Sequence, residues 1–227
     1  MGTVQFGPPE DIVDLLRRSF HLTTFVETGT YQGATAAWAS ASFDKVITIE
    51  AAQQFHEIAQ DQHRNKPNIQ FLHGNSRAIL RDVVAHLTSP ALFWLDAHWM
   101  PGAFGAGAEC PTIDEIAVIL ESAFDHFILV DDARLFLAPP PKPHKASDWP
   151  DISEIILALN VAPNQKRYAA VHRDVIISVP EMAAAVLRDF LQGETTSEMV
   201  AQTASARPIL RQKLSALSNR ILRKTPG

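Results

Sequence analysis

The chain has 227 residues, of which 46% are hydrophobic and 20% are charged, and its formal net charge at pH 7 is −5. This length and apolar fraction fit one domain with a sizeable core, and the small negative charge argues against binding to nucleic acid or to an anionic membrane surface. Its single cysteine, Cys110, excludes an internal disulfide and favours a reducing, cytoplasmic compartment.

The chain begins with Met1–Glu10, which has neither a basic region nor an apolar run, so no signal peptide is expected. Downstream, short apolar runs alternate with amphipathic runs, and none is long enough to span a bilayer. The expected strands are Phe25–Glu27, Lys45–Glu50, Asn68–His73, Ala91–Leu95, His126–Val130, Tyr168–Val171 and Val175–Val179. The expected helices are Asp11–Phe20, Ala34–Ser42, Ala51–Asn65, Arg77–Leu87, Thr112–Ser122 and Ile152–Asn160.

These elements predict the fold class. Uniformly apolar strands that alternate with helices indicate a parallel sheet covered on both faces. The last two strands are joined only by the polar link His172-Arg173-Asp174, which predicts an antiparallel hairpin at one edge. The expected fold is therefore α/β: a Rossmann-like, seven-stranded, mostly parallel sheet with one antiparallel edge hairpin and helices on both faces.

Composition divides the chain into a single Rossmann-like domain, residues 1–192, and a C-terminal segment, residues 193–227. A further helix, Glu181–Gln192, is expected at the end of the domain. The polar stretch Gly193–Arg207 is compatible with a disordered linker, and a basic helical tail, Pro208–Lys224, is expected after it.

Two segments interrupt the alternation, Pro101–Glu109, rich in Gly and Ala, and Ala138–Pro150, rich in Pro. Both follow the carboxyl ends of expected strands, where active-site lids usually lie. The alternative interpretation is that they are plain surface loops, and the sequence leaves the choice open.

Polar residues follow the first five strands at the edge where ligands bind in open α/β sheets. These segments are Glu27-Thr28-Gly29-Thr30-Tyr31-Gln32-Gly33, then Glu50, Gly74-Asn75-Ser76, Asp96-Ala97-His98-Trp99 and Asp131-Asp132-Ala133-Arg134. The repetition of this pattern at five strand ends indicates a shared ligand-binding edge.

The first of these segments has the pattern E-x-G-x-x-x-G, in which glycines allow a sharp turn and a close approach of the backbone to a ligand. Its spacing differs from the G-x-G-x-x-G of dinucleotide binders and suits a nucleoside ligand without a diphosphate. Glu50, about 20 residues further on as in nucleotide-binding folds, would accept hydrogen bonds from both ribose hydroxyls. The alternatives are an ordinary strand-to-helix turn and a solvated strand end.

Together with FLHGNS, LFWLDAHW and ILVDDAR, this arrangement resembles the class I S-adenosylmethionine-dependent methyltransferases over roughly residues 11–180. The resemblance implies that Glu27 and Gly29 lie near the methionine end of the cofactor, and that Asn75 and Ser76 border the adenine. Asn75 stands where the family often has Asp. The cofactor-binding residues implied are Glu27, Thr28, Gly29, Thr30, Gly33, Glu50, Asn75, Ser76 and Asp96.

Asp96, Asp131 and Asp132 end two neighbouring strands and are expected to converge. Three carboxylates repel one another unless a cation such as Mg²⁺ or Mn²⁺ neutralises them. The pattern is similar to that of metal-dependent O-methyltransferases of the catechol and macrolide-sugar types, in which the metal orients and acidifies a substrate hydroxyl. The alternative is that Asp131 or Asp132 caps a helix or binds Arg134.

The candidate catalytic residues are His98 and Asp96. Imidazole titrates near neutrality, which suits a general base, although a structural or solvent-facing His98 is an equal alternative. His126 begins its strand and is discounted, and Cys110 lacks a nucleophile triad and is interpreted as structural. Trp99 and Trp149 are candidates for pocket walls or for packing.

The leading hypothesis is methyl transfer from S-adenosylmethionine to a hydroxyl of a small molecule or sugar, with Mg²⁺ as a candidate cofactor. The alternatives are a nicotinamide-dependent oxidoreductase, a non-catalytic nucleoside-binding module, and metal-dependent hydroxylation or hydrolysis. The sequence identifies neither the methyl acceptor nor the oligomeric state, and a homo-oligomer stays open.

Overall fold

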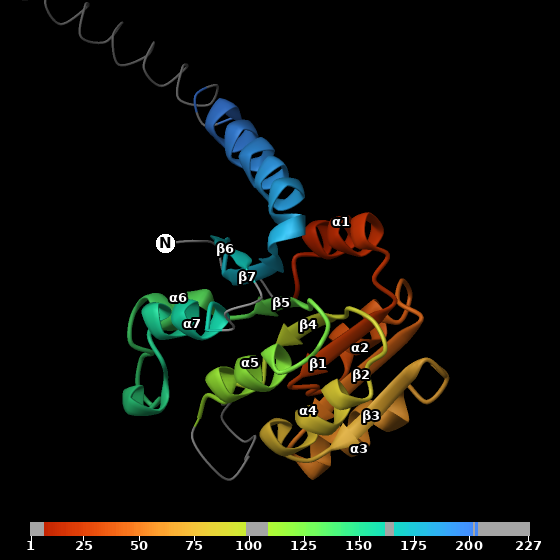
Figure 1. Ribbon diagram of the computed structural model, residues 1–227. Helices are drawn as coiled ribbons and strands as arrows, with labels where there is room; N and C mark the ends of the chain where they lie inside the picture. The colour runs from red at the N-terminus through yellow and green to blue at the C-terminus, as the bar shows by residue number, and fades with distance from the viewer. Residues whose placement is uncertain (1–6, 99–108, 162–165, 202, 204–227) are drawn as a thin grey trace, which may run out of the picture. The chain divides into compact units, whose positions relative to one another are not determined.

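The computed structural model describes residues 7–98, 109–161, 166–201 and 203 (Figure 1). Trp99, most of the Gly- and Ala-rich segment and the expected basic tail lie outside these residues. The described chain divides after Ala184 into two units, which are taken separately. No helix in the described ranges is long and apolar enough to cross a membrane.

The first unit contains a seven-stranded sheet with the order β3-β2-β1-β4-β5-β7-β6. Its strands are β1 (Thr24–Thr28), β2 (Lys45–Glu50), β3 (Ile69–His73), β4 (Leu92–Leu95), β5 (Phe127–Val130), β6 (Arg167–His172) and β7 (Val175–Pro180). Strands β1 to β5 are parallel, whereas β7 runs antiparallel to both β5 and β6. The predicted α/β fold class with an antiparallel edge hairpin is confirmed.

Seven α-helices surround this sheet in the described part of the first unit (Figure 1). They are α1 (Glu10–Phe20), α2 (Ala34–Ala39), α3 (Gln53–Gln62), α4 (Ser76–Ala85), α5 (Thr112–Leu120), α6 (Ala133–Leu137) and α7 (Ile152–Leu159), with short 3-10 turns at Ala146–Asp148 and Glu181–Ala183. The short α6 has no counterpart among the expected elements.

Alternation along β1 shows that both faces of the sheet are covered. The Phe25 ring packs against Trp38 of α2, with ring centroids 6.2 Å apart. Val26, the next residue, belongs instead to the core cluster that includes residues of α4, α5 and α7. Because successive side chains of a strand point to opposite faces, Phe25 and Val26 are buried on opposite faces of the sheet. The apolar runs that predicted the strands are thus explained by two-sided burial.

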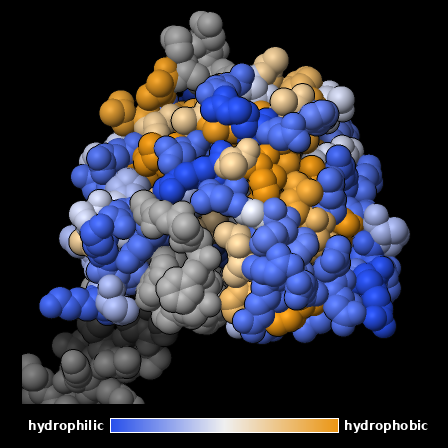
Figure 2. All heavy atoms as spheres, turned by 90° about the horizontal axis from the view of Figure 1, so that it is seen from below, coloured by the Kyte–Doolittle hydropathy of each residue, from blue (hydrophilic) through white to orange (hydrophobic). Residues whose placement is uncertain are grey.

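The structure differs from expectation beyond the sheet. Residues 184–201 are helical, so the helix continues past Gly193 into the stretch whose polarity suggested a disordered linker. The hydroxyls of Thr195, Thr196 and Ser197 each donate to the carbonyl oxygen four residues earlier. These polar side chains therefore bond within the helix. The face seen in Figure 2 is mostly hydrophilic, with apolar residues exposed at its upper left and to the right of its centre.

Candidate functional site

The strand register brings the expected ligand-binding residues into one row. Thr28 pairs with Ile49 on one side and with Leu95 on the other, and Leu95 pairs with Val130. Backbone hydrogen bonds continue this pairing beyond the strands, from Gly29 N to Ile49 O and from Asp96 N to Thr28 O. The segments that follow β1, β2, β4 and β5 therefore share one edge of the sheet, as the sequence predicted.

Gly29 lies where the first loop meets the backbone after β4. Its φ is +88°, and a Cβ at this position would lie 2.2 Å from the carbonyl oxygen of Asp96. No other residue type fits there, because both the backbone conformation and the space exclude a side chain. Gly33 also has a positive φ, of +80°, at the start of α2, where a Cβ would meet the His63 ring at 2.8 Å.

Glu50 ends β2 with a buried carboxylate that braces this loop. Its Oε2 accepts a hydrogen bond from Tyr31 N and its Oε1 accepts one from Ala52 N, both at 2.8 Å. A carboxylate oxygen accepts up to two hydrogen bonds, so each retains one acceptor direction. That remaining capacity suits a pair of vicinal hydroxyls, as on a ribose.

Glu27 is almost fully enclosed in β1, with 1% of its surface exposed. Its Oε2 accepts a hydrogen bond from the Thr48 hydroxyl at 2.5 Å, and the Thr30 hydroxyl lies 2.5 Å from that of Thr48. Burial raises the pKa of Glu27 to about 8, and the nearby charge of Glu50 adds to the increase. Without a ligand, this carboxyl is therefore largely protonated at neutral pH.

On the β3 side, Asn75 is the N-cap of α4 and its Oδ1 accepts a hydrogen bond from Arg77 N at 2.9 Å. Ser76 beside it is buried. Glu115 of α5 is also buried, and burial raises its pKa to about 7, against the effect of the Ser76 and Thr28 hydroxyls. The sequence analysis did not identify Glu115. Its position among the apolar residues of α5 was the feature of the sequence that could have revealed it.

At the other end of the row, the structure groups Asp131, Asp132 and Asp174, each of which has one carboxylate oxygen within 4.8 Å of those of the other two. We call these three residues the acidic cluster. The sequence analysis did not identify Asp174 as part of this group. Its position could have been deduced, because β7 runs antiparallel to β5 and the turn before β7 therefore lies at the carboxyl end of β5. Burial raises the pKa of Asp131 to about 7, and Asp132 adds to the increase.

Asp96 lies close to the acidic cluster without belonging to it. It is half-buried, and burial raises its pKa well above the ordinary value, with further increases from the charges of Asp131 and Asp132. The three expected acids are thus electrostatic neighbours. The set of carboxylates within metal-binding reach of one another, however, contains Asp174 in place of Asp96.

Arg134 already neutralises part of the acidic cluster. Its guanidinium donates to Asp132 Oδ1 at 2.7 Å and to Asp174 Oδ2. This confirms the alternative that Asp132 binds Arg134, whereas Asp132 makes no side-chain cap bond at the start of α6. The carboxylates suit a hard divalent cation chemically, but they fit one only if Arg134 moves away. Mg²⁺ binding stays a prediction.

His98 is brought next to the acidic cluster but is enclosed. Its Nε2 lies 3.0 Å from the Thr112 hydroxyl, and its Nδ1 lies 3.8 Å from Asp132 Oδ2. Its ring packs against those of Phe136 and Trp149, with centroids 5.5 and 5.2 Å away. Burial lowers the pKa of His98 to about 4, so the imidazole is neutral at physiological pH.

The Pro-rich segment is folded over His98 and held by Glu109. The Glu109 carboxylate accepts hydrogen bonds from Trp149 Nε1 at 2.8 Å and from Lys145 N at 3.0 Å, and pairs with His144 at 3.3 Å. Trp149 is consequently buried in the packing around His98. Of the two expected interpretations of Trp149, the described contacts favour packing.

Two further sequence-based interpretations agree with the structure. Burial raises the pKa of the Cys110 thiol to about 11, which disfavours a nucleophilic thiolate. His126 accepts a hydrogen bond from Ala91 N at the amino ends of the strands, away from the candidate site.

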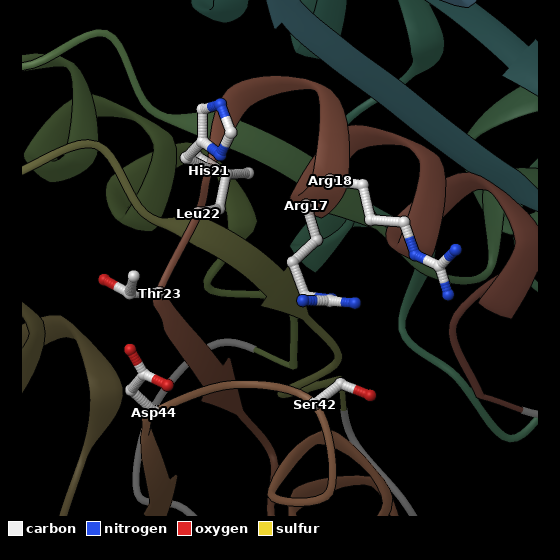
Figure 3. Close-up of a pocket in the computed structure, with 7 residues that line it drawn as sticks. All are labelled: Arg17, Arg18, His21, Leu22, Thr23, Ser42 and Asp44. Atoms are coloured by element: carbon white, nitrogen blue, oxygen red, sulfur yellow. The ribbon is translucent and has the colours of Figure 1, made fainter.

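A pocket opens at the same amino-terminal edge of the sheet (Figure 3). Its lining residues come from the end of α1 and from the segments before β1 and β2: Arg17, Arg18, His21, Leu22, Thr23, Ser42 and Asp44. None of the residues expected to bind a cofactor lines it. The pocket is therefore separate from the candidate site.

The comparisons with known proteins bear on the fold. No protein-family model and no curated protein matches the sequence. Among solved structures, a protein from Klebsiella pneumoniae described as an O-methyltransferase superposes with a TM-score of 0.57 at 12% identity, over 79% of this chain and 83% of its own. An O-methyltransferase from Bacillus cereus, in complex with SAH (S-adenosylhomocysteine), superposes with a TM-score of 0.53 at 15% identity, over 77% of this chain and 82% of its own.

An amino pentose methyltransferase from Micromonospora echinaspora, bound to S-adenosylmethionine, gives a TM-score of 0.51 at 12% identity, over 75% of this chain and 89% of its own. At these identities the similarity concerns the fold alone. The chain has the fold of class I methyltransferases, and the resemblance drawn from its sequence is confirmed at that level.

Replacing Gly29 tests the close approach of the two loops. We expect Gly29→Ala to lower the melting temperature by several degrees, because the new Cβ collides with the Asp96 carbonyl. Gly193→Ala is the matched control, since a Cβ there meets nothing within 4 Å, and a helical Gly→Ala change stabilises by about 0.5–1 kcal/mol. Calorimetric melting of both variants measures the effect, and equal melting temperatures would contradict it.

The protonation of Glu27 predicts a pH-dependent effect. A carboxyl whose folded pKa is raised to about 8 contributes stability below its ordinary value of 4.5, and this contribution is lost as pH rises through about 8. The stability of Glu27→Gln relative to wild type should therefore increase between about pH 5 and pH 9, by about 2 kcal/mol or more. Denaturant titrations measure it; the exposed Glu57→Gln should show no such trend.

Proposed function

We propose that this chain transfers a methyl group from S-adenosylmethionine to a hydroxyl oxygen of a small molecule or sugar. The observation that carries the proposal is the position of Glu50, whose buried carboxylate braces the Gly29 loop and keeps one acceptor direction free on each oxygen. The reaction is a displacement at a sulfonium methyl group, for which a protein supplies alignment and a deprotonated acceptor.

The remaining cofactor contacts are assigned by their place along the row. In the proposal, Glu50 binds the ribose hydroxyls, Asn75 and Ser76 border the adenine, and Glu27 lies beside the methionine end with Thr28, Gly29, Thr30, Gly33 and Asp96. The spacing of the glycines argues against a nicotinamide cofactor, because it lacks the G-x-G-x-x-G pattern that binds a diphosphate. Bound SAH in the Bacillus cereus structure gives independent support.

On the acceptor side, Asp96 is the better placed of the two candidate catalytic residues. It is half-buried at the edge of the sheet, and burial raises the pKa of its carboxyl, which makes the carboxylate a stronger proton acceptor than an exposed one. His98 is enclosed by Phe136 and Trp149 and faces Asp132. We therefore assign proton removal to Asp96 and a positioning role to His98. Mg²⁺ would polarise the acceptor oxygen if it bound, but no step of the proposal depends on it.

Calorimetric titration with S-adenosylmethionine, S-adenosylhomocysteine and NAD tests the cofactor. We expect binding of the first two compounds and at least about tenfold weaker binding by Glu50→Ala, because the ribose loses its acceptors. Glu57→Ala on the exposed side of α3 is the control and should bind like wild type. Unchanged affinity in Glu50→Ala, or a preference for NAD, would contradict the proposal.

A further inference from the structure

We propose that Arg134 is the resident cation of the acidic cluster, where it takes the place of a divalent metal ion. Methyl transfer by this chain would then be independent of divalent metal. The second statement rests on the proposed function, whereas the first concerns the charges of the described residues alone.

The contacts of Arg134 support this assignment. Its guanidinium bridges two members of the acidic cluster, Asp132 and Asp174. Its backbone N–H also donates to Asp174 Oδ1 at 3.0 Å, and the preceding Ala133 N–H donates to the Asp174 carbonyl oxygen at 2.8 Å. The backbone of Arg134 is therefore tied to the turn before β7, and its side chain, 43% exposed, contacts both Asp132 and Asp174 from the start of α6.

Arg134 supplies a positive charge within the acidic cluster without an added ion. Asp132 also donates its backbone N–H to Asp131 Oδ1 at 2.7 Å, so the third carboxyl of the cluster has a hydrogen-bond donor of its own. The two carboxylates that contact Arg134 share one guanidinium, which carries its charge at every physiological pH. A divalent cation would have to displace this group and repay its hydrogen bonds.

The guanidinium also fixes the orientation of Asp132. With Oδ1 bound to Arg134, the second oxygen of Asp132 faces His98 Nδ1 at 3.8 Å. That nitrogen is buried and has no hydrogen-bond partner among the described residues. Arg134 thus determines which carboxylate oxygen faces the imidazole beside Asp96, and acts as a positioning residue.

The test measures metal binding directly, by electron paramagnetic resonance of Mn²⁺ added to the full-length protein. We expect negligible Mn²⁺ binding by wild type at micromolar ion concentrations. Arg134→Gln should bind Mn²⁺ at least about tenfold more tightly, because it leaves Asp132 and Asp174 unpaired. The double variant Arg134→Gln/Asp174→Asn should lose this gain, and Arg134→Lys, which keeps the charge, should resemble wild type.

The matched control is Arg81→Gln, which breaks an exposed ion pair with Glu121 outside the acidic cluster and should leave Mn²⁺ affinity unchanged. Tight Mn²⁺ binding by wild type would overturn the proposal, even if the variants failed to fold. So would the absence of any gain in folded Arg134→Gln.

Activity separates the two statements. If methyl transfer is observed, wild type should keep full turnover in EDTA, and loss of turnover there would overturn metal independence. If no methyl transfer is observed but Arg134→Gln gains Mn²⁺ affinity, the proposed function fails while the assignment of Arg134 as the resident cation stands.

Discussion

The contact between Gly29 and the backbone of Asp96 is the constraint on which the candidate site depends. It sets how closely the first loop approaches the segment after β4, and only glycine permits that distance. Because the neighbouring strands pair in parallel register, Glu50 on one side and Asp131 on the other lie at the same height along the sheet. One close backbone contact therefore determines whether groups from four separate strands lie along a single ligand.

Burial of carboxyl groups is the second property that unites the site. Glu27, Glu115 and Asp131 all have raised pKa values, chiefly because they are removed from water. Protonation is one way to tolerate such groups, and pairing with a cation is another. The protein uses both along one edge of the sheet. Near β1, Glu27 is protonated and accepts a hydrogen bond from a hydroxyl, whereas near β5 Arg134 pairs with Asp132 and Asp174. Under the proposed function, the sulfonium and ammonium groups of S-adenosylmethionine would bring further positive charge to this edge.

The sequence predicted the features that depend on local pattern. Apolar runs located the strands, because both faces of the sheet are covered, and the polar residues at the carboxyl ends of these runs located Glu50 and Asp131. It did not predict contacts that arise only when distant segments meet. Asp174 reaches the acidic cluster because β7 pairs antiparallel to β5. Glu115 reaches the candidate site because α5 packs against the sheet, and the start of α6 is held by a backbone hydrogen bond from Ala133 to Asp174. The helix beyond Gly193 was missed because a polar composition does not reveal side-chain bonds within a helix.

Glu109 joins two stretches of chain that would otherwise vary independently. It precedes α5, while Lys145 and Trp149, which it holds, follow α6. Changes of shape on one side of this connection are therefore transmitted to the other, since both share one carboxylate. For evolution, the consequence is a constraint on Glu109 itself, since a substitution there removes the hydrogen bonds to Lys145 and Trp149 in one step.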